Sequence, residues 1–126
     1  MKKIISTDQA PGAVGPYSQA VQSGSFLFVS GTLPVDPVTG AFAGDTIETQ
    51  ARQVMENLKA VIQAAGLSMA SVVKCSCFLK DMNDFTAFNG VYAGYFTADP
   101  PARECVQVAR LPKDALVEVS AVCSAD

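Results

Sequence analysis

Three residues in the C-terminal quarter of the chain have side chains that could bind a carboxylate and activate a water molecule. Arg103 and Cys105 are two positions apart in a segment with strand character, so their side chains point to the same side. An arginine can bind a carboxylate through two parallel hydrogen bonds. Glu118, in a following strand-like segment, could hold a water molecule or remove its proton. The alternative is a structural ion pair, which the pattern alone favours because such pairs outnumber catalytic ones.

Two other segments could line a binding site. Tyr17 follows the stiff turn Gly15-Pro16, which would present its hydroxyl group, although a half-buried packing role is the commoner one. Ser30 and Gly31 close a strand-like segment, and a glycine there would let a ligand approach the backbone closely. The alternative for this pair is a plain turn.

The chain contains no histidine, and this absence removes several mechanisms. Ser-His-Asp and Cys-His nucleophiles, HExxH zinc sites and paired-histidine ribonuclease chemistry all require imidazole. The cysteines Cys75, Cys77, Cys105 and Cys123 match no zinc spacing, so we expect buried thiols and no metal. Catalysis would have to use carboxylate, guanidinium, hydroxyl, thiol or backbone groups.

Composition predicts a single globular domain over residues 1–126. Apolar residues make up 49% of the chain and charged residues 17%, which is typical of folded proteins rather than disordered ones. No apolar run is long enough to span a membrane, and the N-terminus has no signal-peptide pattern, so we expect a cytoplasmic protein and no membrane partner. The net charge is -3, whereas nucleic-acid-binding domains are usually basic, so we do not expect a nucleic-acid partner.

The elements that must position these residues follow from hydrophobic periodicity. A helix is predicted from a cap at Asp45, with Glu48 completing a capping box, to the C-terminal stop at Gly66. A second helix begins at Asp84 and carries a stripe of aromatic residues that we interpret as core. Val73, Cys75, Cys77 and Leu79 should share one face of their strand. The predicted strands are residues 3–6, 18–22, 26–30, 72–79, 103–109 and 116–123.

This order of elements predicts a two-layer α+β domain. Helices that connect strands of one sheet usually cross over on the same face, so both helices should cover one face of the sheet. The uncovered face should then hold apolar residues mixed with Arg103, Cys105 and Glu118. A partly apolar, uncovered face favours self-association, and we therefore predict a homo-oligomer.

Several segments together resemble one known family. These are GPYSQA at 15–20, VSG at 29–31, PVDPVTG at 34–40, QARQ at 50–53 with NL at 57–58, AAGL at 64–67 and PARECVQVARLPKD at 101–114. In this order they cover essentially the whole chain. The sequence resembles the RidA (YjgF) family of reactive-intermediate deaminases, also known as the endoribonuclease L-PSP family.

The resemblance implies a fold, an activity and a set of site residues. The fold would be the chorismate-mutase-like α+β homotrimer, with sites in the clefts between subunits. The activity would be hydrolysis of 2-imino acids, such as 2-iminobutanoate and 2-iminopropanoate, released by pyridoxal-phosphate-dependent dehydratases, to 2-oxo acids and ammonia, with no cofactor. Arg103 would bind the substrate carboxylate and Glu118 would orient water. By motif match, the pocket would be completed by Tyr17, Ser30, Gly31, Asn89 and Cys105.

Two alternatives to the deaminase hypothesis remain open. Thr32 and Ser120 stand where many relatives have Gln and Glu, and these differences motivate a small-carboxylate-binding regulatory trimer without turnover. The family also includes members described as endoribonucleases or translation inhibitors. Family membership alone therefore does not decide the function.

Overall fold

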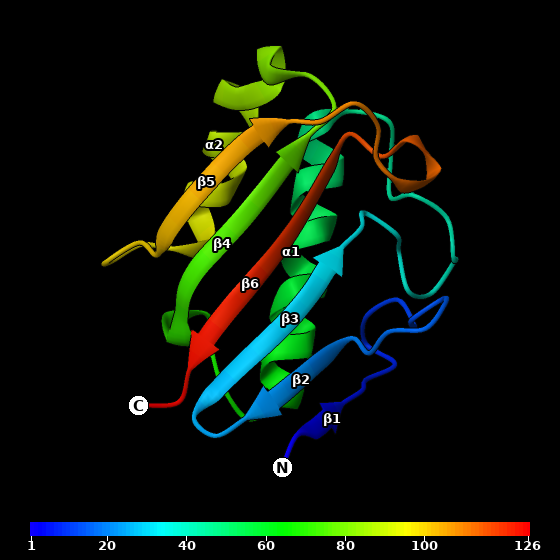
Figure 1. Ribbon diagram of the computed structural model, residues 1–126. Coiled ribbons are helices and arrows are strands. Elements are labelled where there is room, and N and C mark those ends of the chain that lie inside the picture. The colour runs from blue at the N-terminus through cyan, green and yellow to red at the C-terminus, as the bar shows by residue number, and fades with distance from the viewer.

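A six-stranded mixed sheet carries two helices on one of its faces (Figure 1). The computed structural model describes residues 1–126. The helices are α1 (Ile47–Ala64) and α2 (Phe85–Tyr92). The strands are β1 (Lys3–Ile5), β2 (Ala20–Ser23), β3 (Phe26–Thr32), β4 (Val72–Leu79), β5 (Ala102–Gln107) and β6 (Val117–Ser124).

The strands lie in the order β1-β2-β3-β6-β4-β5, so β6 is inserted between β3 and β4. Only β4 and β5 pair in parallel, and α2 makes the connection between them. The other neighbours are antiparallel. This topology puts β5 at one edge of the sheet, two strands away from β6. The predicted α+β class and the placement of both helices on one face are confirmed.

Helix α1 is amphipathic and begins one residue later than predicted. Thr46, not Asp45, is the N-cap, and its hydroxyl oxygen accepts a hydrogen bond from the Thr49 amide at 3.2 Å. Both residue types are good caps, so sequence alone does not separate adjacent candidates. The predicted end is correct: Gly66 has a φ of 80°, and its amide donates to the Gln63 carbonyl.

The aromatic stripe of α2 packs into the core, as predicted. Phe88 is completely buried and its ring lies 5.6 Å from that of Tyr92. Tyr92 in turn packs on Phe96, with ring centroids 4.8 Å apart. A short 3-10 helix, Ala93–Tyr95, extends α2 by one turn. None of the helices is long and apolar enough to cross a membrane.

The two faces of the sheet are defined by alternation along β6, where Val117, Val119, Ala121 and Cys123 are buried under the helices. The parallel register of β4 and β5 corrects one prediction. Arg103 pairs with the fully buried Cys75, and Cys105 pairs with the fully buried Cys77. Arg103 and Cys105 therefore point to the helix-covered face, whereas Glu118 points to the open face.

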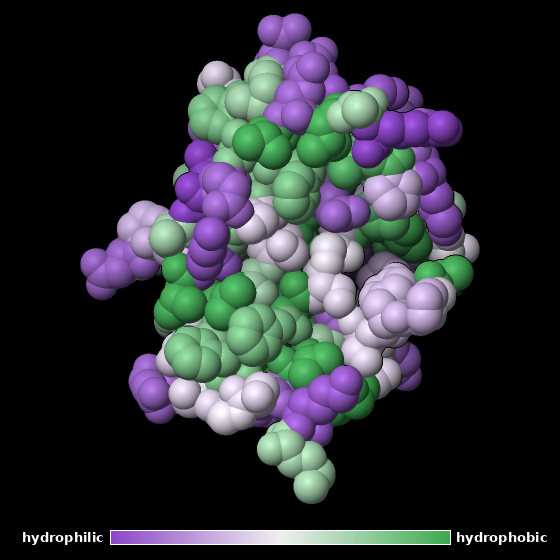
Figure 2. Space-filling view, in the orientation of Figure 1, coloured by the Kyte–Doolittle hydropathy of each residue, from purple (hydrophilic) through white to green (hydrophobic).

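The open face carries an exposed apolar patch formed by Phe26, Phe28, Val73 and Val106, each between 44% and 48% exposed. Figure 2 shows apolar side chains gathered over the part of this face where β3, β6 and β4 run side by side. Val73 belongs to this patch, and its predicted place on the same face as Cys75, Cys77 and Leu79 is wrong. An irregularity in the β4–β6 register between Val72 and Lys74 changes the alternation there.

Candidate functional site

Arg103 is held by helix α2 at the edge of the sheet. Its Nη1 donates to Asn89 Oδ1 at 2.8 Å, and its Cζ lies 5.5 Å from the Phe85 ring centroid and 4.8 Å from that of Tyr92. These ring contacts stabilise the cation without neutralising it. No carboxylate of the chain forms an ion pair with the guanidinium, because the ion pairs are Lys74–Glu104 and Arg110–Asp114. Its remaining N–H groups are available to an anion.

Cys105 is the most exposed of the cysteines and lies beside Arg103 on the same face of β5. Burial raises the pKa of its thiol, and the nearby Arg103 guanidinium offsets part of this effect. Cys75, Cys77 and Cys123 are buried, and burial raises the pKa of Cys123 to about 11. These thiols are therefore protonated near neutral pH and are poor nucleophiles.

Glu118 lines a pocket of about 600 Å³ at the end of the sheet where β3 stops and β6 begins. Its carboxyl group is half-buried, and burial raises its pKa, with no neighbouring charge or hydrogen bond to offset the cost. A carboxylate in this state is a better proton acceptor than an exposed one. The pocket contains the predicted residues Tyr17, Ser30, Gly31 and Glu118, together with Thr32 and Lys113.

Gly31 is required by the position of Glu118. A Cβ atom at residue 31 would lie 2.5 Å from Glu118 Oε2 and 2.8 Å from its Cδ, both closer than atoms pack. The expectation that a ligand approaches the backbone at Gly31 stays a prediction. Within the chain, however, the approaching group is the carboxylate itself.

Ser30 and Tyr17 are fixed by local hydrogen bonds around this pocket. The β3–β6 register shifts between Val29 and Thr32, so Ser30 and Gly31 lie in an irregular stretch of β3. The Ser30 hydroxyl donates to the Ser18 carbonyl at 2.6 Å. The Tyr17 hydroxyl accepts from the Val14 amide at 3.3 Å, and half of this side chain stays exposed to the pocket.

The predicted site residues thus form two groups in one chain. The Arg103 group, with Asn89 and Cys105, lies on the helix-covered face at the β5 edge. The Glu118 group lies on the open side, beyond the intervening β4. The alternative reading of Arg103 and Glu118 as a structural ion pair is wrong, because the two side chains leave opposite faces of the sheet.

Several pocket residues had not been singled out from the sequence. Lys113, with a φ of 56°, and Pro112 lie in the turn before β6, and Gly12 and Val14 lie in the proline- and glycine-rich loop before Tyr17. The motif match at 101–114 includes Pro112 and Lys113 and could have found them, whereas Gly12 and Val14 lie outside every matched segment. No group of three or more His, Cys, Asp or Glu side chains is arranged to hold a metal ion.

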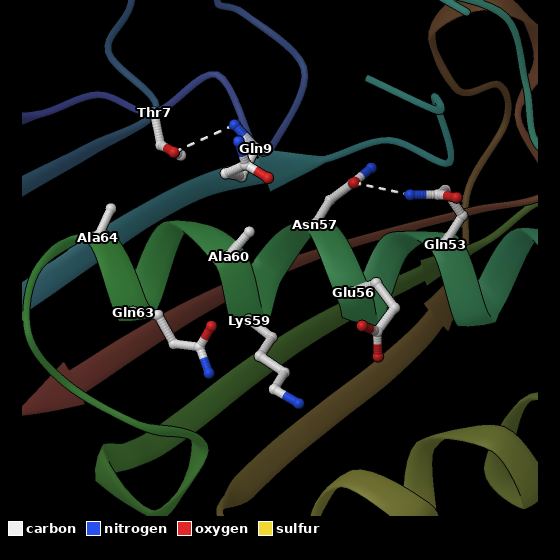
Figure 3. A pocket seen from close by; sticks show the side chains of 9 residues that line it. All are labelled: Thr7, Gln9, Gln53, Glu56, Asn57, Lys59, Ala60, Gln63 and Ala64. Carbon is white, nitrogen blue, oxygen red and sulfur yellow. Dashed lines mark hydrogen bonds between the residues drawn. The ribbon is translucent and has the colours of Figure 1, made fainter. Parts of the chain in front are cut away.

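A second depression, of about 540 Å³, runs along the outer side of α1 (Figure 3). Amide side chains dominate its lining, with Gln53 donating to Asn57 Oδ1 at 2.8 Å. None of the predicted site residues lies in this groove. Thr7 and Gln9 line this groove, and Ala10 and Pro11, which follow them in the chain, line the Glu118 pocket.

The chain is a small α+β protein in which the Arg103 guanidinium forms no ion pair and the half-buried Glu118 carboxyl group has no hydrogen-bond partner. The sequence profile described as endoribonuclease L-PSP matches residues 7–125. The chain therefore belongs to this family, the RidA (YjgF) family.

Individual relatives agree over nearly the full length. A RutC family protein of Pyrococcus horikoshii is 52% identical over 122 residues, covering 97% of each chain. The 2-iminobutanoate/2-iminopropanoate deaminase of Salmonella typhimurium is 51% identical over 125 residues, again 97% of each chain. The crystal structure of Escherichia coli TdcF with bound serine has a TM-score of 0.93 at 49% identity, covering 97% of this chain and 98% of that one.

Proposed function

We propose that this protein hydrolyses 2-imino acids, of the size of 2-iminobutanoate and 2-iminopropanoate, to 2-oxo acids and ammonia. The proposal rests on one observation, which is that the charged groups of Arg103 and Glu118 form no ion pair within the chain. Asn89 orients the Arg103 guanidinium, the Glu118 carboxyl group lies against Gly31, and neither charge is neutralised within the chain. The name of the Salmonella typhimurium relative supports this substrate class.

The substrate site is proposed to form between copies of the chain. Arg103 and Glu118 project from opposite faces of one sheet, so the two side chains of a single chain cannot contact the same small molecule. Arg103 lies at the free β5 edge, and the apolar patch on the open face would be covered by association. A closed ring of identical subunits would bring Arg103 of one copy to the Glu118 pocket of the next. The family resemblance makes this ring a trimer.

The proposed reaction needs an anchored acid and one water molecule. Arg103 binds the substrate carboxylate with the N–H groups that Asn89 does not use. Glu118 takes a proton from water, whose oxygen attacks the imine carbon, and passes this proton to the imine nitrogen, which gives a tetrahedral carbinolamine. Glu118 then takes the hydroxyl proton of the carbinolamine and delivers it to the amino group, so that the C–N bond breaks, ammonia leaves and the C=O bond of the 2-oxo acid forms. Holding the reactants in this geometry supplies the acceleration.

The direct test couples the purified protein to a threonine dehydratase and follows formation of 2-oxobutyrate. We expect the wild type to accelerate the hydrolysis and Arg103→Ala to abolish the acceleration. Arg52→Ala is the matched control, since Arg52 lies exposed on the outer side of α1, and it should keep the wild-type rate. Equal rates with and without the wild-type protein would refute the proposed function.

A mixing experiment tests the shared site. Arg103→Ala and Glu118→Gln chains are each expected to be inactive, and unfolding and refolding them together should restore activity. In a one-to-one mixture of cyclic trimers, three-quarters of the rings contain both chains and each of these has one intact site, so about a quarter of wild-type activity should return. No recovery would mean that each chain supplies both residues of its own site.

The alternatives give different results in the same assays. A regulatory trimer without turnover would bind 2-oxobutyrate in calorimetry but leave the imine hydrolysis rate unchanged. An endoribonuclease would cleave RNA after rigorous purification and lose that activity in the Glu118→Gln variant. The absence of histidine and the net charge of -3 count against the ribonuclease.

A further inference from the structure

The chain buries three polar side chains, and all three are amides. Gln19 is 9% exposed, Gln50 is 4% exposed and Asn57 is 1% exposed. Burying an amide is costly unless its donors and acceptors are bonded, and an apolar residue of similar shape often replaces a bonded pair with little loss. The hydrogen-bond partners of these amides therefore show which parts of the chain the buried side chains hold in place.

Gln19 joins the two sides of the Glu118 pocket. Its Oε1 accepts from the Thr7 amide at 2.7 Å, and its Nε2 donates to the carbonyls of Thr7, Ala10 and Pro11 at 3.0, 3.4 and 2.7 Å. Its own carbonyl accepts from the Ser30 amide at 3.0 Å. One residue thus connects the outer wall of the pocket to the irregular stretch of β3.

The other two amides follow the same pattern. Asn57 Nδ2 donates to the carbonyls of Leu33 and Val35 at 3.0 and 2.8 Å, and both of these residues line the pocket. Gln50 Oε1 accepts at 2.9 Å from the amide of Leu116, two residues before the reactive carboxyl group. All three buried amides therefore hold main chain that forms this pocket or leads into it.

The segment that Gln19 holds, residues 7–11, contributes to the lining of both depressions. Thr7 and Gln9 line the groove along α1, where Figure 3 shows them above the helix, with Thr7 Oγ1 accepting from the Gln9 amide. Ala10 and Pro11 line the Glu118 pocket on the other side. Residues 6–19 belong to no strand or helix, so sheet or helix hydrogen bonds do not fix this wall. Ala10 packs into the hydrophobic core, and the Gln19 side chain supplies hydrogen bonds to the main chain of Thr7, Ala10 and Pro11.

We infer that Gln19 is a positioning residue of the substrate pocket, which holds the wall formed by residues 7–11 and thereby the loop that carries Tyr17. This inference rests on the proposed function for its substrate, a small 2-imino or 2-oxo acid. Glu118 and Arg103 lie on strands that Gln19 does not hold through its side chain. Loosening the wall should weaken substrate binding and leave the chemical step largely intact.

The test uses two variants of similar shape and a stability control. Gln19→Met removes all the amide bonds, and Gln19→Glu keeps the acceptor for Thr7 but removes the donor that faces the carbonyls. Val54→Ala deletes buried methyl groups from α1, away from the pocket, and controls for a general loss of stability. The readouts are hydrogen exchange of residues 7–17, the Kd for 2-oxobutyrate by calorimetry, and KM and kcat for the imine.

We expect both Gln19 variants to speed exchange in residues 7–17 by about tenfold and to raise Kd and KM by about tenfold, with kcat within about twofold. Partial unfolding, as in Val54→Ala, would instead lower the apparent kcat and leave KM unchanged. Wild-type exchange in this segment, or faster exchange with unchanged Kd, would overturn the inference. If the wild type fails to hydrolyse imines, the proposed function fails, and exchange together with the Kd still decides the role of Gln19.

Discussion

Arg103 and Glu118 leave opposite faces of the same sheet, separated by strand β4. Arg103 is in register with buried Cys75, on the side covered by the helices, and Glu118 is in register with Phe78 on the open side. The two strands are about 10 Å apart, at the usual spacing between neighbours. Within one chain neither residue neutralises the other, and this separation is the reason that we propose a site between copies of the chain.

Arg103→Lys should lose most of the activity although the positive charge is kept. A lysine ammonium is a point charge and cannot form two parallel bonds to a carboxylate, nor does it reproduce the guanidinium contacts with the Phe85 and Tyr92 rings. We expect KM to rise and kcat/KM to fall about 100-fold, which corresponds to about 2.7 kcal/mol. Steady-state kinetics with the coupled dehydratase would measure this, and a variant within threefold of wild type would contradict bidentate anchoring.

Gly31→Ala should fold and lose turnover. The new methyl group would occupy the place of the Glu118 carboxyl group, which sits at the end of a flexible side chain and can move away. We therefore expect a melting temperature within a few degrees of wild type and a kcat about 100-fold lower, because the carboxyl group no longer faces the water site.

Gly94→Ala is the matched control for this substitution. A Cβ at residue 94 meets no atom within 4 Å, and the backbone there has an ordinary φ. This variant should keep wild-type activity. Full activity in Gly31→Ala would show that the position of Glu118 does not limit the reaction.

The cap of α1 gives a stability prediction that distinguishes two adjacent residues. Thr46→Ala removes the hydroxyl that accepts from the Thr49 amide and should lower the free energy of unfolding by about 1 kcal/mol. Asp45→Ala, one residue earlier, leaves that bond intact and should change it by less than about 0.5 kcal/mol. Urea denaturation of the two variants would compare them directly, and the reverse order would place the cap at Asp45.

Much of the fold could be predicted because long periodic segments leave little choice. Strand β4 was predicted with its observed bounds, and α1 ends at Ala64, just before its predicted stop at Gly66. The two faces of the sheet were harder to predict. In β5, arginine, glutamate and cysteine alternate without a clear apolar side, so only the parallel register with β4 decides that Arg103 faces α2.

The residues of the candidate site were found mainly through motif resemblance, and their spatial division was not foreseen. Sequence distance places Glu118 fifteen residues after Arg103, but the topology inserts β4 between their strands. The buried amides were missed for another reason. Hydrophobic periodicity identifies buried apolar residues. It does not identify a buried polar residue such as Gln19 or Asn57, whose side chain bonds to a loop distant in the sequence.

The pH dependence should report the burial of Glu118. Because burial raises the pKa of this carboxyl group, the folded protein binds its proton more readily than the unfolded chain does. As a base it must be ionised, so kcat/KM should fall as pH decreases through a value above the usual glutamate pKa of about 4.3. An acid limb at or below that value would contradict the role of Glu118.

The raised pKa of Glu118 also predicts that the folded protein loses stability as the pH rises, whereas its activity should increase. Above the raised pKa, the folded state must hold a poorly solvated charge, which costs stability, and this cost disappears as the pH falls through the folded and then the unfolded pKa. Glu118→Gln should therefore raise the melting temperature at pH 7 by a few degrees and give no increase near pH 4. Glu48→Gln is the control, because Glu48 is exposed in the first turn of α1, where a negative charge is favourable, and its removal should not stabilise the protein. Equal melting temperatures for wild type and Glu118→Gln at pH 7 would contradict an uncompensated, half-buried charge at Glu118 in the folded protein.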